Sequence, residues 1–185
     1  MQETQVKEQI KKVVSGDSHA YTDLVEGYKG LVYSICMKIL NNQELAEEAA
    51  QDTFIKAFKN LKRFKGDSKF STWLYQIAYF TAINASRKKK VEKVELNNLE
   101  VSLENDLIEA DDRKNILYHA INQLKPDEKA IITLYYLDEF TLEEVSEISK
   151  ITVSNVKVKV HRIKKKLNSI LENILSDELK DMKYG

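Results

Sequence analysis

Residues 141–167 read TLEEVSEISKITVSNVKVKVHRIKKKL and contain two helical patterns separated by a short turn. Thr141 and Glu144 have the spacing of a capping box, which predicts the start of a short helix. The second pattern has the spacing of one apolar helical face, at Val156, Val160, Ile163 and Leu167. Seven basic and no acidic residues lie in residues 150–166, so the opposite face is strongly positive. A short helix, a turn and a basic second helix predict a helix-turn-helix that binds DNA.

Composition limits the class of protein. The 185 residues can form one domain or two small ones, and abundant charge with one proline and five glycines indicates an all-α protein. No stretch approaches the ~18 consecutive apolar residues of a membrane span, and no secretory signal opens the chain. Cys36 is the one cysteine, which excludes an intramolecular disulfide and a paired-cysteine metal site. We therefore expect a cytoplasmic protein that needs no cofactor and no metal.

The net charge of zero hides a strong segregation of charge along the chain. Residues 61–90 contain eight basic residues and one acidic residue, whereas residues 91–112 contain one basic and eight acidic residues. A single charged run usually only solvates a helix face, but nucleic acids respond to the local potential. Two basic segments on apolar-striped helices therefore favour two contacts with nucleic acid.

Apolar residues at helical spacing predict a helical bundle within residues 1–90. Its helices are expected at residues 6–14, 20–40, 43–61 and 71–89. Asn41-Asn42 separates the second from the third, because asparagine can both end a helix and cap the next one. The third helix is expected to turn five apolar residues inward: Leu45, Ala49, Phe54, Ile55 and Phe58.

The second domain follows an acidic segment. Residues 91–112 are weakly periodic and lack aromatic residues, which predicts a linker that is flexible or transiently helical. Helical spacing resumes in residues 113–185, where Pro126 begins a new helix at its first turn. The expected fold class is therefore all-α, with two small helical domains joined by an acidic linker. The sequence leaves open whether the domains pack together or move about the linker.

The second helix of the helix-turn-helix offers side chains that can read DNA. Opposite its apolar stripe lie Asn155, Val158, His161, Arg162 and Lys165. Arg162 can form a bidentate contact with a guanine edge, and Val158 can touch a thymine methyl group. Ser154 is expected to cap this helix near the DNA backbone. Three flanking lysines are expected to contact phosphates: Lys157, Lys159 and Lys164.

A second candidate surface, within residues 63–90, mixes basic and aromatic side chains. Aromatic rings can stack on unpaired bases while cations follow the nucleic-acid backbone. Most of the rings are expected in the core, which is where buried rings are commonly found. Tyr79 and Phe80 cannot both point inward from one helix, so at least one of them is expected to be exposed.

An acidic face on the third helix has two interpretations. Its carboxylates, which include Glu44, could hold a metal ion or dock a basic partner. No histidine lies at ligand spacing, so a partner is favoured over a metal. The sequence also has no nucleophile paired with a base and no phosphate-binding loop. We therefore expect a protein that acts by binding, without enzymatic activity.

In two blocks, the sequence resembles the extracytoplasmic-function (ECF) sigma factors of bacterial RNA polymerase. The first block contains AEEAAQDTF at residues 46–54 and FKGDSKFSTWLYQIA at residues 64–78, followed by RKKK at residues 87–90. The second block is residues 124–167, which includes the helix-turn-helix. The resemblance covers nearly the whole chain in the family's order, so it is more specific than a helix-turn-helix alone.

The resemblance implies a protein that binds core RNA polymerase and directs it to promoters. Residues 1–90 would dock on the polymerase and read and melt the −10 element, and residues 113–185 would bind duplex DNA at the −35 element. The implied polymerase contacts are Glu47, Glu48, Gln51, Asp52 and Phe54. The implied −35 contacts are Ser154, Asn155, Lys157, Val158, Lys159, His161, Arg162 and Lys165. The implied −10 contacts are Arg63, Phe64, Lys65, Asp67, Ser68, Lys69, Tyr79, Phe80, Asn84, Arg87 and Lys88.

Further partners are implied by the same resemblance. A flipped non-template base would be held in the loop at residues 62–69. The acidic linker would thread through the polymerase, where its charge could mimic nucleic acid. An anti-sigma factor, often membrane-bound, would cover both domains and hold the chain inactive at the inner face of the membrane.

Three departures from the family pattern affect these contacts. Tyr79-Phe80 stands where the family often has Arg-Asn, which changes the base preference expected at the −10 element. Val158-Lys159 replaces a frequent Ser-Arg pair, and lysine lacks the planar fork of arginine, so −35 contacts should shift toward phosphates and methyl groups. Lys150 stands at a common glycine, which predicts a strained or slightly different turn.

Two other functions are compatible with the sequence. A polymerase-independent helix-turn-helix regulator would use only the second domain, with the first as a sensing or dimerisation module. A protein that only sequesters an anti-sigma factor would not start transcription. The acidic face on the third helix favours the sigma-factor interpretation, because a stand-alone regulator needs no polymerase-docking surface.

Overall fold

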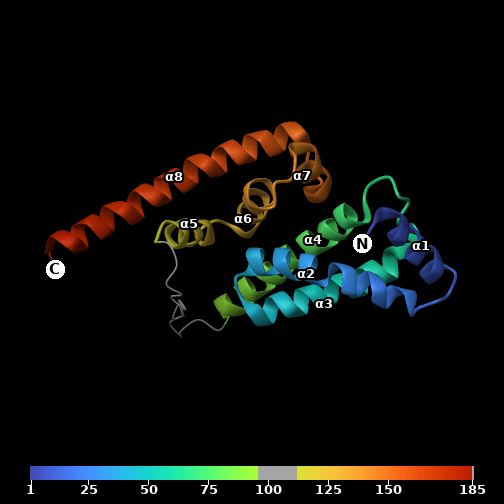
Figure 1. Cartoon of the computed structure of the whole chain (residues 1–185). Helices are drawn as coiled ribbons and strands as arrows, with labels where there is room; N and C mark the ends of the chain where they lie inside the picture. The colour runs from blue at the N-terminus through green and yellow to red at the C-terminus, as the bar shows by residue number, and fades with distance from the viewer. Residues whose placement is uncertain (96–111, 185) are drawn as a thin grey trace.

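The computed structural model describes residues 1–95 and 112–184, and the regular elements in these ranges are all helical (Figure 1). The first half contains α1 (Glu3–Val14), α2 (Ala20–Leu40), α3 (Gln43–Asn60), the 3₁₀ turn η1 (Leu61–Arg63) and α4 (Phe70–Glu95). The second half contains α5 (Asp112–Asn122), α6 (Pro126–Ile132), the π-helical turn η2 (Thr133–Leu137), α7 (Leu142–Ser149) and α8 (Val153–Tyr184). The all-α prediction is confirmed. None of the described helices is long and apolar enough to cross a membrane.

Helices α2, α3 and α4 pack against one another, and α1 lies against α2. The buried residues of α3 are Ala46, Ala49, Ala50, Thr53 and Ala57. Because this stripe of small residues is the buried face, Ile55 and Phe58 lie on other sides of the helix, where they are 51 % and 45 % exposed. The prediction that these two residues point inward is therefore wrong.

The predicted break at Asn41-Asn42 is confirmed. Asn41 adopts the left-handed conformation (φ 47°) and donates its N–H to the carbonyl oxygen of Met37 at 2.8 Å. The side-chain oxygen of Asn42 accepts the N–H of Leu45 at 2.9 Å and so caps α3. The two asparagines thus end α2 and begin α3 without an intervening loop.

Helix α4 is longer than predicted. It continues to Glu95, so the first residues assigned to the acidic linker are helical. The remainder of that predicted linker, residues 96–111, lies outside the described residues.

The helix-turn-helix forms as its sequence predicts, except at one cap. Thr141 Oγ1 accepts the N–H of Glu144 at 3.2 Å, and the Glu144 carboxylate accepts the N–H of Thr141 at 2.9 Å, which completes the capping box. Lys150 takes the left-handed conformation (φ 58°) that the turn requires. Helix α8 begins at Val153, and its first turn is capped by Thr152, whose Oγ1 accepts the N–H of Asn155 at 3.3 Å. Ser154 already lies inside the helix, so the prediction that it is the cap is wrong.

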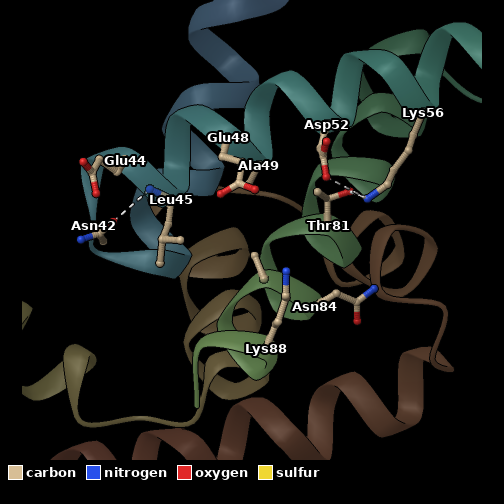
Figure 2. Close-up of a pocket in the computed structure, with 11 residues that line it drawn as sticks. Asn42, Glu44, Leu45, Glu48, Ala49, Asp52, Lys56, Thr81, Asn84 and Lys88 are labelled. Atoms are coloured by element: carbon tan, nitrogen blue, oxygen red, sulfur yellow. Dashed lines mark hydrogen bonds and ion pairs between the residues drawn. The ribbon is translucent and has the colours of Figure 1, made fainter. Parts of the chain in front are cut away.

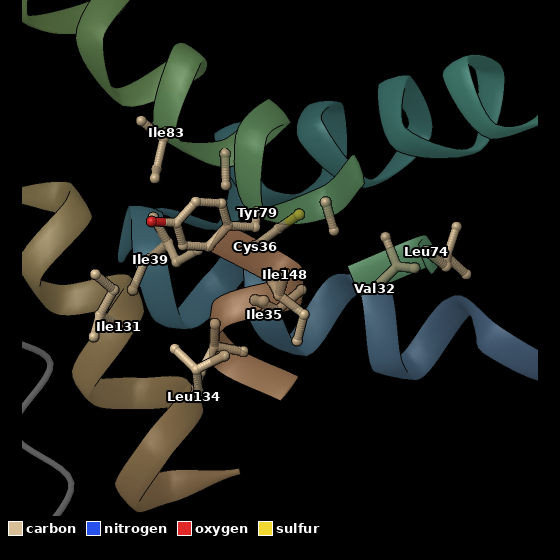
Figure 3. Packing of buried hydrophobic residues seen from close by; sticks show 14 of the residues in the cluster. Val32, Ile35, Cys36, Ile39, Leu74, Tyr79, Ile83, Ile131, Leu134 and Ile148 are labelled. Carbon is tan, nitrogen blue, oxygen red and sulfur yellow. The ribbon is translucent and has the colours of Figure 1, made fainter. Parts of the chain in front are cut away.

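The two halves of the chain pack against each other. Helices α6 and α7 lie against α2 and α4, and one hydrophobic cluster runs through both halves (Figure 3). Tyr79 of α4 lies in this cluster with Ile39 of α2 and Ile131 of α6. The sequence leaves open whether the two domains pack together or move about the linker. The structure shows them packed together.

Candidate nucleic-acid interface

Helix α8 presents one buried face and one exposed basic face. The apolar stripe is buried as predicted, at Val156, Val160, Ile163 and Leu167. The side chains expected to face DNA are exposed to solvent: Ser154, Asn155, Lys157, Val158, His161, Arg162, Lys164 and Lys165. A helix anchored through one face with cations on the other has the form of a DNA-recognition helix.

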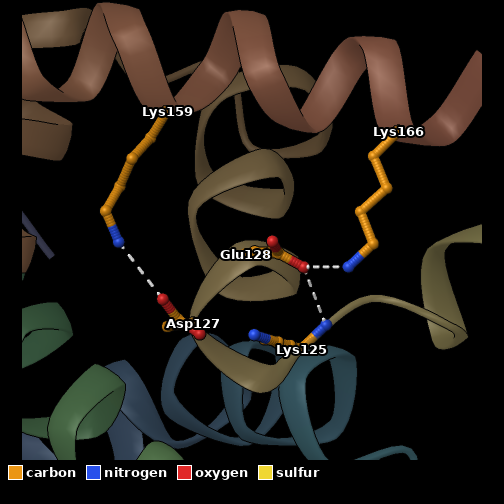
Figure 4. Close-up of polar contacts among 5 residues, drawn as sticks. All are labelled: Lys125, Asp127, Glu128, Lys159 and Lys166. Atoms are coloured by element: carbon orange, nitrogen blue, oxygen red, sulfur yellow. Dashed lines mark hydrogen bonds and ion pairs between the residues drawn. The ribbon is translucent and has the colours of Figure 1, made fainter.

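Two lysines of α8 are bound to acidic residues of α6 (Figure 4). Lys159 Nζ lies 3.1 Å from Asp127 Oδ2, and Lys166 Nζ lies 2.6 Å from Glu128 Oε2. Glu128 also accepts the N–H of Lys125 at 3.1 Å. Burial favours a raised pKa for Glu128, but the hydrogen bonds from Lys166 and Lys125 outweigh burial and lower its pKa.

Partly exposed ion pairs of this kind add little stability. Lys159 is held by Asp127, so in this arrangement it does not project toward a DNA phosphate as predicted. The other basic side chains of this face are exposed to solvent, as the prediction of DNA contacts requires.

A groove lies between α3 and α4 and has a volume of about 440 Å³. It is lined by Lys56, Asn60, Arg63, Trp73, Gln76, Ile77, Phe80, Thr81 and Asn84. The groove therefore combines rings for stacking, amides for hydrogen bonds to base edges and cations for phosphates. This is the set of groups that proteins use to bind single-stranded nucleic acid.

The neighbouring aromatic residues support the loop at residues 62–69. Phe64 packs against Phe70 and Trp73, with ring centroids 5.6 Å and 5.2 Å away. Phe64 is therefore a packing residue in this structure. In the same loop the side chains of Lys65, Asp67 and Lys69 are exposed, and Ser68 is partly buried. Arg87, on α4, is also exposed.

Tyr79 and Phe80 lie on adjacent faces of α4, and their rings meet edge to face with centroids 5.1 Å apart. Phe80 is 38 % exposed and lines the groove, which confirms that at least one of the two rings is exposed. Tyr79 is 4 % exposed and lies among the residues between the two halves of the chain. Burial raises the pKa of Tyr79 to about 12, and the nearby Asp127 carboxylate acts in the same direction. In this arrangement Tyr79 does not line the groove, whereas three of the other predicted −10 residues do: Arg63, Phe80 and Asn84.

Three of the acidic residues of α3 line a pocket beside α4. Glu44, Glu48 and Asp52 line a second part of the groove, of about 460 Å³, opposite Asn84 and Lys88 of α4 (Figure 2). At one end of this pocket, Lys56 lies 3.8 Å from Asp52 and donates to the Thr81 hydroxyl at 3.2 Å (Figure 2).

The solvent-exposed side of α3 is acidic toward the start of the helix and apolar toward its end. Glu47 and Gln51 are exposed there, together with Ile55 and Phe58. We call these four residues the outer face of α3. Phe54, which the sequence predicts as a polymerase contact, is half-buried and packs against the core.

Sequence reasoning missed several residues of these surfaces. Gln76 lies one helical turn before Phe80, so its place in the groove could have been found from helical spacing. Asn60 and Lys56 reach the groove from a different helix, and no local pattern indicates that. Ile55 and Phe58 were assigned to the core because they are apolar.

We also searched the described residues for side chains that could bind a metal ion or act as a nucleophile. In residues 1–95 and 112–184, no group of three or more histidine, cysteine, aspartate or glutamate side chains could hold a metal ion. Cys36 is buried, and burial raises the pKa of its thiol to about 12, so it is not poised to act as a nucleophile.

Comparisons with known proteins identify the family. Residues 24–91 match the family model Sigma-70 region 2, and residues 114–167 match Sigma-70, region 4. The ECF RNA polymerase sigma factor SigW of Bacillus subtilis is 34 % identical over 186 residues, which cover 93 % of this chain and 100 % of SigW. The chain belongs to the family of ECF RNA polymerase sigma factors. The ECF RNA polymerase sigma-E factor of Escherichia coli K12 is 28 % identical over 180 residues, covering 90 % of this chain and 94 % of that protein.

Solved structures share the fold. CnrH, in complex with the cytosolic domain of CnrY, matches with a TM-score of 0.64 at 18 % identity, over 89 % of this chain and 96 % of CnrH. The sigma factor RpoE of Bartonella quintana, in complex with the anti-sigma factor NepR, matches with a TM-score of 0.63 at 19 % identity, over 82 % of this chain and 96 % of RpoE. At these identities the likeness concerns the fold alone.

Family membership decides between the functions that the sequence leaves open. Members of the sigma-factor family are transcription initiation factors without enzymatic activity. The chain is an alternative sigma factor that directs RNA polymerase, and a regulator that works without polymerase is not favoured.

Proposed function

We propose that this sigma factor contacts promoter DNA through two separate surfaces and core RNA polymerase through α3. Residues 1–90 would serve the −10 element and the polymerase, and residues 113–185 the −35 element. The observation that carries the proposal is the exposed face of α8. Its basic and polar side chains point away from a fully formed buried stripe, and packing among the described residues does not account for them as a group.

At the −35 element, α8 would lie in the major groove of duplex DNA. Asn155, Val158 and Arg162 lie three to four residues apart on one exposed side, which suits contacts with successive base edges. Lys157, Lys164 and Lys165 flank this line and would neutralise phosphates.

At the −10 element, the groove between α3 and α4 would bind the melted strand. Phe80 supplies an exposed ring, Gln76 and Asn84 supply amides, and Arg63 supplies a charge at one end. A ring can stack on any base, whereas the amides can select among base edges, so affinity and selectivity come from different residues.

Replacing Phe80 with alanine should weaken binding of single-stranded DNA by the holoenzyme by about 1 kcal/mol, because one stacking ring is lost. The measurement is fluorescence anisotropy of an oligo-dT probe with holoenzyme assembled from core polymerase. Tyr33→Ala is the matched control, since that ring is exposed to a similar degree, 36 %, on α2. Equal affinities for the Phe80→Ala and wild-type proteins would remove the stacking role.

On the polymerase side, the outer face of α3 joins apolar anchors to acidic residues. Exposed Ile55 and Phe58 are large apolar side chains with Glu47 nearby on the same helix. Interfaces are commonly built from such an apolar centre with a polar rim. A complementary partner would carry an apolar groove bordered by basic side chains, and we assign this partner to core polymerase.

Reversing one charge of this face tests the docking assignment. Glu47→Lys should weaken binding to core polymerase about tenfold, because it opposes a basic partner surface. Titration of labelled core polymerase measures the affinity, and Glu172→Lys, an exposed charge reversal on α8, is the matched control. If both variants bind polymerase like the wild type, the outer face of α3 is not the docking surface.

We also propose an anti-sigma factor as a partner. The support is that the sigma factor RpoE, which has a similar fold, was solved with the anti-sigma factor NepR, and that CnrH, of similar fold, was solved with the cytosolic domain of CnrY. If the partner of this chain is likewise the cytosolic part of a membrane protein, it would hold the sigma factor at the inner face of the membrane. Membrane fractions from cells that express a tagged chain would test this, with release on solubilisation as the expected result.

A further inference from the structure

A small pocket lies between α2, α5, α6 and η2. Its volume is about 180 Å³, and an apolar cavity of ~150 Å³ is known to hold a molecule of the size of benzene. Three of the residues that line it are exposed to solvent, so small molecules can enter: Asn41, Tyr118 and Asn122. The pocket shares no lining residue with the groove between α3 and α4 or with the exposed face of α8. It is therefore a separate candidate site.

One wall of the pocket carries a buried lysine. Lys129 of α6 is 6 % exposed, and its ammonium donates a hydrogen bond to the side-chain oxygen of Asn122. The neighbouring carboxylates of Asp127 and Glu128 pair instead with lysines of α8. Burial lowers the pKa of Lys129 to about 8, so the group is still mostly protonated at pH 7. The pocket thus holds a buried positive charge that no carboxylate of the described residues neutralises.

A second buried polar group lies beside this lysine. Thr133 follows Lys129 by four residues, which places it on the same side of the helical segment, and it also lines the pocket. Thr133 is 1 % exposed, and its hydroxyl oxygen has no hydrogen-bond partner among the described residues. Buried hydroxyl groups in folded proteins are usually hydrogen-bonded, because an unpaired one has lost its contacts with water. Both groups therefore lack a partner that a ligand in this pocket can supply.

The chemistry of the lining indicates the class of ligand. Its apolar side chains are Met37, Tyr118, Ile121 and Leu137. Lys38, the other cation of the lining, is already paired with Asp138. A matching ligand therefore has one anionic group and a short apolar body. A carboxylate suits the polar wall, because its two oxygens can accept hydrogen bonds from an ammonium and a hydroxyl at once.

We propose that this pocket binds a small carboxylic acid, with its carboxylate on Lys129 and Thr133 and its apolar body against the apolar side chains. The bound acid would give the lysine a counter-charge and the hydroxyl an acceptor. Neither promoter DNA nor polymerase takes part in this contact, so the proposal does not rest on the proposed function. The sigma factor would then have a small-molecule site in addition to its surfaces for macromolecules.

Isothermal titration calorimetry of the full chain with sodium benzoate tests the site. Benzoate joins a carboxylate to a ring of benzene size, and benzamide is the matched probe of similar shape without the charge. We expect a single benzoate per chain, bound at least tenfold more tightly than benzamide or inorganic phosphate. The absence of saturable benzoate binding would overturn the site. Equal affinities for benzoate and either other probe would overturn the assignment to a carboxylic acid.

Two substitutions test where the carboxylate lies. Lys129→Met removes the charge from a side chain of similar length and should weaken benzoate binding at least tenfold. Thr133→Val removes the hydroxyl with little change of shape and should weaken binding about threefold to tenfold. Thr72→Val is the matched control, because Thr72 is 5 % exposed and lies outside the pocket, so the affinity should equal that of wild type.

Circular dichroism checks that each variant is folded. If Lys129→Met loses its helices, Thr133→Val decides the question alone. An unchanged benzoate affinity in either folded variant, or the same loss of affinity in the Thr72→Val control, would overturn this placement of the carboxylate.

Discussion

Replacing Leu134 with alanine is expected to lower the free energy of unfolding by about 2–5 kcal/mol. Leu134 is fully buried in η2 and belongs to the hydrophobic cluster that both halves share. The shorter side chain loses its transfer free energy and leaves a cavity between elements that are distant in sequence. Since the cluster is shared, we expect one cooperative transition at a lower urea concentration, followed by circular dichroism at the helical signal.

The control for this variant is Leu175→Ala, a change of the same chemistry at a residue that is 47 % exposed on α8. Its effect should stay within about 0.5 kcal/mol. If Leu134→Ala costs less than about 1 kcal/mol, or if two separate transitions appear in the wild type, the halves do not share a core in solution.

Replacing Arg162 with alanine is expected to weaken binding to the −35 duplex by about 1–3 kcal/mol and to relax base preference at one position. Arg162 is exposed on the groove side of α8, and its guanidinium can donate two hydrogen bonds to one guanine. Competition binding of holoenzyme to a promoter and to duplexes with single base changes at the −35 element measures both effects.

Two further variants distinguish recognition of a base by Arg162 from electrostatic attraction to the DNA phosphates. Arg162→Lys keeps the charge but loses the planar fork, so it should lose preference as alanine does while retaining more affinity. Lys164→Ala should weaken binding about equally on all sequences, as expected for a phosphate contact. An equal loss on all sequences for Arg162→Ala would make Arg162 a phosphate contact as well.

Local elements of this fold follow from the sequence because their causes are local. The capping box at Thr141 and the break at Asn41 depend on residues within one or two turns, and both formed as predicted. The packing of the two halves against each other could not be predicted, because Ile35 and Leu134 have the same apolar pattern whether they face their own half or the other one. Periodicity reports that a face is buried, but it does not identify the surface that buries it.

The candidate site shows the same limit. Large apolar residues on α3 suggested an inward face, yet Ile55 is exposed because alanines provide the close packing. For Tyr79 and Phe80, the sequence indicated that one ring is exposed, and only the packing against the second half selects Phe80. The sequence did not indicate that Lys159 forms an ion pair, because its partner, Asp127, lies 32 residues away.

Run-off transcription with purified core polymerase tests the central claim, that this chain is a sigma factor which directs polymerase to promoters. The templates are a library of promoter-sized genomic fragments, and core polymerase without the chain is the baseline. The account predicts discrete transcripts from a subset of fragments that share −10 and −35 sequences, and their loss with the Arg162→Ala chain. Binding of the chain to duplex DNA without a specific transcript from any fragment would contradict it.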